Sequence, residues 1–341
     1  MAVVGREAQA RRFAGLERRG QVRLALLLLP AVAFLLFFYG YPVAAMLLRS
    51  VNDPAWGSQN FEPLVTARST IDLVVAELPM NAYVRVFGIT LQIALGVTAA
   101  TLLLGYPVAY ALASLPPTQA NLLMILVLVP FWTSILVRSY AWMVLLGREG
   151  LINQFLVGVG FAGEPLQLLN TRGAVYVGMI HVLLPFMILP LYAVMRGIDR
   201  SLLRAAENLG ARPSQVFRRV FLPLSLPGVA AGCLLVFILA LGFYITPALL
   251  GGQRDVMVSM LIQQQVTQLN WGVASALALV LLVFALAIYV AFTRILGVQR
   301  LFGGARTLEH RASPDRPLRS GWRGAASVVA DNDPRSVGCC C

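Results

Sequence analysis

Long apolar stretches recur along the chain, and polar segments that carry arginine separate them. Six of these stretches are long enough to cross a bilayer, which takes about 20 apolar residues in a helix. They lie at about residues 24–48, 86–113, 121–146, 173–195, 223–250 and 271–293. In lipid, a chain must satisfy its backbone polar groups internally, so each stretch is predicted to be helical. The sequence thus predicts an all-α membrane protein with six transmembrane helices.

The composition supports a membrane setting and limits the chemistry. The chain is 58% hydrophobic and 12% charged, with a mean hydropathy of +0.76, which is too apolar for a soluble domain. Its net charge of +12 comes from arginine alone, because the sequence contains no lysine. A P-loop needs a lysine on the phosphates, so a nucleotide-driven process would require an ATPase on another subunit. The arginines fall between apolar stretches, which favours membrane orientation over nucleic-acid binding.

The distribution of arginine predicts the orientation. Twenty of the 27 arginines fall on one side of the predicted spans and six on the other, with Arg138 inside a span. The arginine-rich side is expected to be cytoplasmic. Residues 1–23 are therefore predicted to be a basic cytoplasmic segment, and residues 297–341 a cytoplasmic tail that is largely disordered. The first apolar run exceeds the ~7–15 residues of a signal peptide, so it is interpreted as an uncleaved anchor.

The sequence offers little that resembles a catalytic or metal site. Cys233 lies in an apolar run, and Cys339, Cys340 and Cys341 end the sequence. The terminal triplet could be acylated or bind metal, although a chance tail is the simpler interpretation. His181 is predicted to be a packing residue, because no second ligand stands at metal-binding spacing nearby. No nucleophile–base pair is evident, which disfavours a membrane enzyme.

The segments opposite the cytoplasm are predicted to be polar connections. Short helices are expected around Thr70–Glu77 and Leu151–Val159. Glu149 and Asp255 could attract a cation near the outer mouth, but solvated side chains are the simpler prediction. Gln263, Gln264, Gln265 and Asn270 form an amide-rich edge, which could contact a partner or be a plain polar loop.

The cytoplasmic loop at residues 196–222 has more internal structure than a simple connection. Leu202, Ala206 and Leu209 recur at helical spacing. Gly210 can end that helix in a left-handed conformation, and Pro213 can begin a second one. Such a loop could enter a cleft of a soluble partner or lie on the lipid surface, and the pattern alone leaves both possibilities open.

Several motifs resemble a known family. Leu203–Ala211 (LRAAENLGA) and Phe221–Gly228 (FLPLSLPG) resemble the EAA loop of ABC importer permeases. Pro130–Trp142, Gly147–Asn153 and Tyr244–Gly252 resemble permease subunits of the spermidine/putrescine branch. The resemblance covers about residues 24–296 and implies the type I importer (MetI-like) fold for that permease domain.

The resemblance also implies partners and a site. The partners would be an ABC ATPase dimer, a second homologous permease subunit and a periplasmic binding protein, all at a bacterial inner membrane. ATP and magnesium would be used by the ATPase, with no cofactor in this chain. The implied coupling residues are Arg204, Ala205, Ala206, Glu207, Gly210 and Phe217. The family's loop usually has Glu-Ala-Ala where this chain has Arg204-Ala205-Ala206, so a salt bridge made by that glutamate is in doubt.

A polyamine is the first expectation for the substrate, and other amines, opines, phosphonates and iron complexes are alternatives. Candidate residues of the solute pathway are Trp132, Arg138, Tyr140, Trp142 and Tyr244. Arg138 would repel a polyamine, which favours a structural role for it or an anionic substrate. A secondary transporter or channel is the rival function. It is disfavoured because no Asp or Glu lies within a predicted span, where coupled transporters commonly place one.

Overall fold

The computed structural model describes residues 27–53, 56–65 and 82–295, and no strand occurs among them. Five helices are long and apolar enough to cross a membrane, and a sixth crossing results if one bent helix pair counts as a single span. The five are Leu27–Asn52, Tyr83–Ser114, Arg172–Arg196, Pro213–Leu241 and Trp271–Arg294. The all-α membrane fold is therefore confirmed. Residues 1–23, the tail at 297–341 and the helix expected at Thr70–Glu77 lie outside the described residues.

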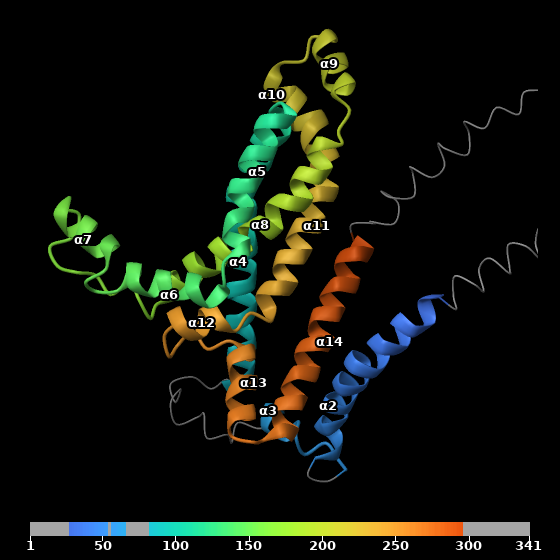
Figure 1. Cartoon of the computed structure of the whole chain (residues 1–341), viewed down its shortest axis with the longest axis vertical. Helices are drawn as coiled ribbons and strands as arrows, with labels where there is room; N and C mark the ends of the chain where they lie inside the picture. Colours follow the sequence, from blue (N-terminus) through green and yellow to red (C-terminus); the bar gives the residue numbers. More distant parts are fainter. Residues whose placement is uncertain (1–26, 54–55, 66–81, 296–341) are drawn as a thin grey trace, which may run out of the picture. The chain divides into compact units, whose positions relative to one another are not determined.

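Helix α8 (Arg172–Arg196) forms the centre of the fold, with α4 (Ala82–Ser114) and α11 (Leu222–Leu241) packed along it (Figure 1). All three are apolar around their circumference, as expected of helices that contact protein on one side and lipid on another. Their buried side chains form one core, which includes Ile93, Val97, Met179, Leu183, Met187, Leu191, Val236 and Phe237.

Glycines allow these three helices to approach closely. A Cβ added at Gly96 of α4 would come within 2.6 Å of the Tyr176 ring on α8. On α11, a Cβ at Gly228 would lie 2.9 Å from the Val194 Cβ and 3.2 Å from the Pro190 carbonyl oxygen. Small residues at such contacts are typical of membrane helices, whose association depends on close packing.

The first and last described helices form a second group. The chain is helical from Leu27 to Asn52, through a π-helical turn η1 (Leu36–Gly40) and α2 (Tyr41–Asn52). Helix α14 (Trp271–Ile295) packs against α2 and against α13 (Val258–Thr267). The short helix α3 (Glu62–Val65) lies near the same end as α13 (Figure 1).

The predicted third span at 121–146 is wrong as a continuous helix. Helix α5 (Pro117–Trp132) stops, and the segment from α6 (Ile135–Leu146) to α7 (Leu151–Gly158) turns away by 90°. Thr133 and its successor are extended, and the Thr133 hydroxyl donates to the Pro130 carbonyl at 2.8 Å. The hydropathy pattern missed the break because both sides of it are apolar. The expected short helix after residue 150 is confirmed as α7.

The fifth span also differs from the predicted 223–250. It begins early, because α10 (Pro213–Val216), the π-helical turn η3 (Phe217–Phe221) and α11 run on as one helical segment. It ends at Gly242, after which α12 (Ile245–Leu250) packs on α6 and α8. The amide-rich edge predicted after this span lies partly in helix α13. Within it, Gln265 is buried and accepts a hydrogen bond from Asn270.

Candidate functional site

Helix α9 (Arg200–Asn208) lies at one end of the described chain, at the opposite end from α3 and α13 (Figure 1). Asp199 caps its start by accepting from the Ser201 N–H at 2.8 Å. That backbone hydrogen bond lowers the pKa of the Asp199 carboxyl below its usual range. Because the lower pKa belongs to the folded state, the charged cap is present at neutral pH and is lost only as the solution becomes distinctly acidic.

The end of α9 confirms the expected role of Gly210. This glycine has a φ of +83°, in the left-handed region. Its N–H donates to the Glu207 carbonyl at 2.9 Å, and the Ala211 N–H donates to the Ala206 carbonyl at 3.1 Å. The two bonds form a Schellman motif, which satisfies carbonyls that the helix end would otherwise leave unpaired. Pro213 then opens α10, as predicted.

Two arginines fasten this loop to the transmembrane core. Arg200 donates to the Ala113 carbonyl at 2.9 Å, and Arg196 donates to the Leu115 carbonyl at 3.1 Å. These carbonyls lie at the C-terminal end of α4, where the helix dipole is negative and carbonyls lack helical partners. Both arginines therefore act as a C-terminal cap for α4, in addition to any effect of their charge on the orientation of the chain in the membrane.

The aromatic residues behind the loop also belong to the fold. Phe217 lies edge-on to Tyr110, with ring centroids 5.5 Å apart, and stacks on Phe221 at 5.8 Å. It also lies edge-on to Tyr106 at 6.2 Å. Phe217, predicted as a coupling residue, is thus anchored against α4 of its own chain.

The two faces of α9 are reversed relative to an ordinary surface helix. One face carries Leu202, Ala205, Ala206 and Leu209, with Leu202 49% and Leu209 88% exposed. The other face carries Arg200, Leu203, Arg204 and Glu207, which line a groove between α9 and the core. An amphipathic helix normally buries its apolar face against its own protein. Here the apolar face points away from the chain.

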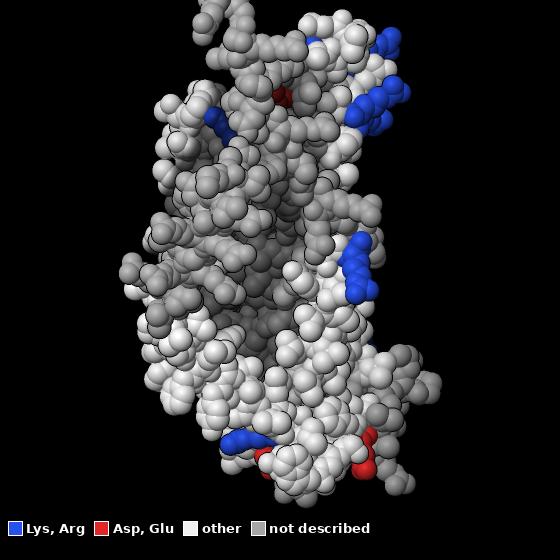
Figure 2. Space-filling model, turned by 90° about the vertical axis from the view of Figure 1, so that its right-hand side faces the viewer, with Lys and Arg blue, Asp and Glu red and all other residues white. Residues whose placement is uncertain are grey.

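The groove behind α9 has a volume of about 1030 Å³. Its other walls are the ends of α4 and α8, the turn around Pro116, the start of α5 and the segment formed by α10 and η3. Arg204 lies within electrostatic range of Asp199 of its own chain. The structure therefore offers Arg204 an acidic neighbour within the loop. On the face drawn in Figure 2, basic side chains are visible at the end that carries α9, and another is visible at mid-height.

The predicted pathway residues lie on neighbouring elements but do not form one cluster. Trp132 stands at the end of α5 and is 86% exposed, and Tyr140 on α6 is 56% exposed. Trp142 instead donates its indole N–H to His181 Nδ1 at 3.0 Å. This contact gives one ring nitrogen of His181 a hydrogen-bond partner, as the predicted packing role requires. Tyr244, at the start of α12, is partly exposed.

Buried hydroxyls join the elements that carry these residues. Ser139 of α6 and Thr246 of α12 are each 1% exposed, and their hydroxyl oxygens lie 3.1 Å apart. Arg138 precedes Ser139 on α6. Two of its nitrogens, Nε and Nη1, are buried without a hydrogen-bond partner among the described residues.

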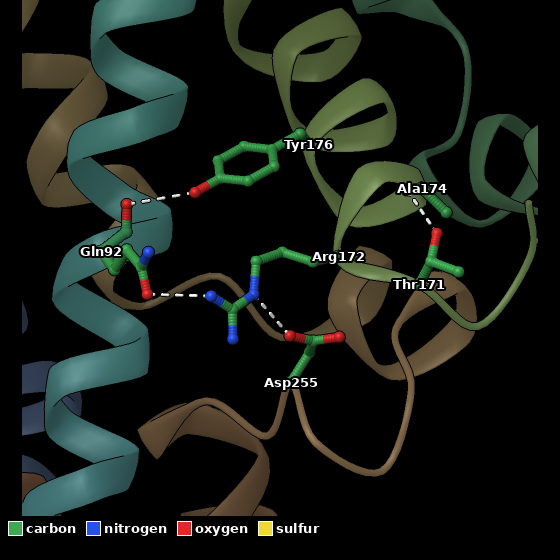
Figure 3. Close-up of polar contacts among 6 residues, drawn as sticks. All are labelled: Gln92, Thr171, Arg172, Ala174, Tyr176 and Asp255. Carbon is green, nitrogen blue, oxygen red and sulfur yellow. Dashed lines mark hydrogen bonds and ion pairs between the residues drawn. The ribbon is translucent and has the colours of Figure 1, made fainter.

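The prediction that Asp255 is solvated is wrong. Asp255 is only 6% exposed and accepts from Arg172 Nε at 2.7 Å (Figure 3). Arg172 Nη1 also donates to Gln92 Oε1 at 2.9 Å, and the Tyr176 hydroxyl donates to the Gln92 carbonyl at 3.3 Å. This cluster joins α4, α8 and the segment before α13. Sequence reasoning missed it because the three elements lie far apart in the chain. Glu149, by contrast, is exposed as predicted.

Comparison with known proteins connects this arrangement to a transport function. Residues 92–297 match the family described as the binding-protein-dependent transport system inner membrane component. The chain belongs to this family. It is therefore a permease component of a binding-protein-dependent transport system, and the predicted ABC importer permease is confirmed. The matched region includes α9, the groove behind it and the break between α5 and α6.

Two relatives and one solved structure illustrate the match. The permease is 43% identical over 197 residues to the spermidine/putrescine transport system permease protein PotB of Haemophilus influenzae, covering 57% of this chain and 69% of that protein. It is 38% identical over 218 residues to PotB of Escherichia coli, covering 63% and 79%. The crystal structure of a bacterial ABC transporter that imports the acidic polysaccharide alginate matches with a TM-score of 0.62 at 20% identity, covering 83% of this chain and 96% of that one. That match supports the fold.

Proposed function

We propose that the permease is one of two homologous subunits that form the solute pathway of an ATP-driven polyamine importer in a bacterial inner membrane. A periplasmic binding protein delivers the solute, and a separate ATPase dimer binds ATP and magnesium. The polyamine assignment is supported by the names of the PotB relatives, and the permease role by the family match.

The outward apolar face of α9 is the observation that supports coupling to an ATPase. Leu202 and Leu209 are exposed on a helix whose charged face is turned toward its own groove. An amphipathic helix of this kind fits the helix-in-groove mode of recognition, in which apolar residues enter a partner's cleft. Among the alternatives for this loop, docking is favoured because Arg200 and the Schellman turn hold the helix at the end of the molecule rather than along the core.

Substitution of Leu209 tests this docking surface. Leu209→Arg places a charge in the proposed contact while leaving the fold intact, because the side chain has few contacts within the chain. We expect the ATPase retained by the tagged permease to fall about tenfold or more, the size of effect typical of a lost contact at the centre of an interface. The matched control is Leu151→Arg, which changes an equally apolar side chain, 66% exposed, at the start of α7. Equal ATPase retention in both variants would contradict the assignment of α9.

Reconstituted transport tests the rest of the proposal. Proteoliposomes that contain both permease subunits and the ATPase should take up labelled spermidine only with the binding protein and ATP. Uptake that continues without the ATPase would refute ATP-driven import. If a different solute were taken up in an ATP-dependent manner and neither spermidine nor putrescine were taken up, only the polyamine assignment would be refuted.

A further inference from the structure

Arg138 is an unusual residue for its position in the fold. It lies on α6, inside the apolar region that continues the broken third span. Its Nε and Nη1 atoms are buried, and no acceptor within the described residues lies in hydrogen-bonding reach of either. Guanidinium N–H groups that are buried without an acceptor are unfavourable, and charges within the membrane are almost always paired or turned toward a cavity.

The surroundings of Arg138 offer donors rather than acceptors. His181 of α8 lies within electrostatic range of the guanidinium. Its Nδ1 already accepts from Trp142, which stands one turn after Arg138 on the same side of α6. A neutral His181 ring therefore carries its remaining proton on Nε2. The pair presents N–H groups only, so the group that completes it has to supply acceptors, and an anion would also balance the charge of the guanidinium.

The described part of the chain does not supply that anion. The acidic residues of the described part of the chain lie in loops or near helix ends outside the long apolar helices: Asp53, Glu62, Glu149, Glu164, Asp199, Glu207 and Asp255. Asp255, the buried one among them, is paired with Arg172. A second copy of this chain would bring the same helices, and these lack a carboxylate too.

The depth of the site disfavours a lipid headgroup. His181 lies about 14 Å along α8 from its first residue, at a rise of 1.5 Å per residue, and within one turn of the middle of that helix. Lipid headgroups begin roughly 15 Å from the bilayer midplane, because the hydrocarbon layer is about 30 Å thick. An acceptor at the depth of Arg138 therefore comes from protein, from the solute or from water in a cavity.

The edge of α6 beside Arg138 is open to another protein. Val137, Tyr140 and Val144 recur on one side of α6 and are all exposed. The opposite side, with Ser139 and Leu146, is buried against the chain itself. Arg138 stands at the seam between the two sides. A helix that covered the exposed side would bring its own side chains next to the guanidinium.

We propose that Arg138 pairs with an Asp or Glu on a membrane helix of the second permease subunit, and that this ion pair joins the two subunits along α6. The proposal rests on the two-subunit importer proposed above. A cationic solute is excluded as the partner by its charge. Because this chain lacks such a carboxylate in its long apolar helices, the pairing also requires a second subunit with a different sequence.

Charge reversal tests the ion pair in the complete transporter. We expect Arg138→Glu to reduce the amount of second permease subunit that co-purifies with the tagged chain by about tenfold or more. Arg138→Lys keeps the charge and should retain most of it. The matched control is Arg148→Glu, which reverses an exposed arginine two residues after α6 and should assemble like wild type. Tagged chain recovered from the membrane at wild-type amounts shows that Arg138→Glu has not simply failed to fold.

Rescue identifies the partner residue. Each Asp and Glu within the membrane helices of the second subunit is changed to Lys in the Arg138→Glu background, and one of these changes should restore co-purification at least fivefold. If Arg138→Glu itself prevents membrane insertion, the milder Arg138→Met is used with Asp→Asn or Glu→Gln in the partner, and the double variant should assemble better than Arg138→Met alone. The absence of any rescuing position would overturn the proposal.

Two further outcomes would contradict the proposed ion pair without contradicting the proposed importer function. In one, Arg138→Glu assembles fully and loses only solute affinity, which would place Arg138 on the pathway. In the other, tagged and untagged copies of this chain assemble with each other through Arg138 without a second subunit. Failure of the wild-type chain to bind any second permease subunit would instead contradict the proposed function.

Discussion

Single residues in this permease are placed by partners far along the chain. Arg172 and Asp255 are 83 residues apart in sequence and only 2.7 Å apart between Nε and Oδ1. A carboxylate that is nearly buried needs such a partner, because burial without one costs several kcal/mol. Gln92 accepts a hydrogen bond from a second N–H of the same guanidinium, so one arginine holds α4, α8 and the segment before α13 together.

Removal of this arginine should destabilise the permease through the carboxylate that remains. For Arg172→Ala we expect a loss of about 2 kcal/mol in the free energy of unfolding, which is typical of a charged hydrogen bond left unmade. The double variant Arg172→Ala/Asp255→Asn should recover part of it, because the orphaned charge is gone. The measurement is the Tm of the detergent-solubilised chain, with Arg254→Ala, an exposed neighbour, as control. Additive losses in the double variant would show that the two residues do not interact.

At the scale of helices, close packing of α8 against α4 and α11 depends on residues without side chains. Gly228 faces backbone atoms of α8 as well as the Val194 side chain, so a larger residue there has little room to adjust. The break in the third span is also accompanied by a difference in helix packing. Apolar helices α5 and α6 meet at two non-helical residues. Both halves pack on α8, but the first half also packs on α4 and the second on α12.

Gly228→Val should separate α11 from α8. Overpacking of a well-filled contact typically costs about 1–3 kcal/mol, and this contact includes backbone that cannot rotate away. We expect a lower Tm and less folded protein in the membrane. Gly88→Val is the matched control, since it is also a helical glycine but a Cβ there meets nothing within 4 Å. Equal effects of the two substitutions would mean that helix propensity, rather than packing, explains the loss.

At the scale of the whole molecule, the end with α9 and the end with α13 are chemically different. The α9 end presents an apolar helix face above a groove lined by Arg196, Arg200 and Arg204. The other end carries the Arg172–Asp255 pair. The excess of arginine on the α9 side across the full sequence predicts that this side faces the cytoplasm.

Thiol labelling checks this orientation. In a background without the four native cysteines, Ser214→Cys should react with a membrane-impermeant maleimide in inverted vesicles and not in intact spheroplasts. Phe161→Cys, on the loop after α7, should show the opposite behaviour, since the predicted topology places this loop on the outer side and the Phe161 side chain is 81% exposed. Labelling of both positions from the same side would refute the predicted topology.

The amino-acid sequence alone determined the helical membrane fold, the approximate spans and the internal structure of the loop at 196–222. These features follow from local properties: apolar length, the left-handed turn that Gly210 allows and the fixed φ of Pro213. Only the tertiary structure decided where the third span breaks, that Asp255 is buried against Arg172, and that α9 turns its apolar face outward. Each of those depends on which distant elements come into contact. Hydropathy and motif spacing describe neighbours along the chain, so they carry little information about such contacts.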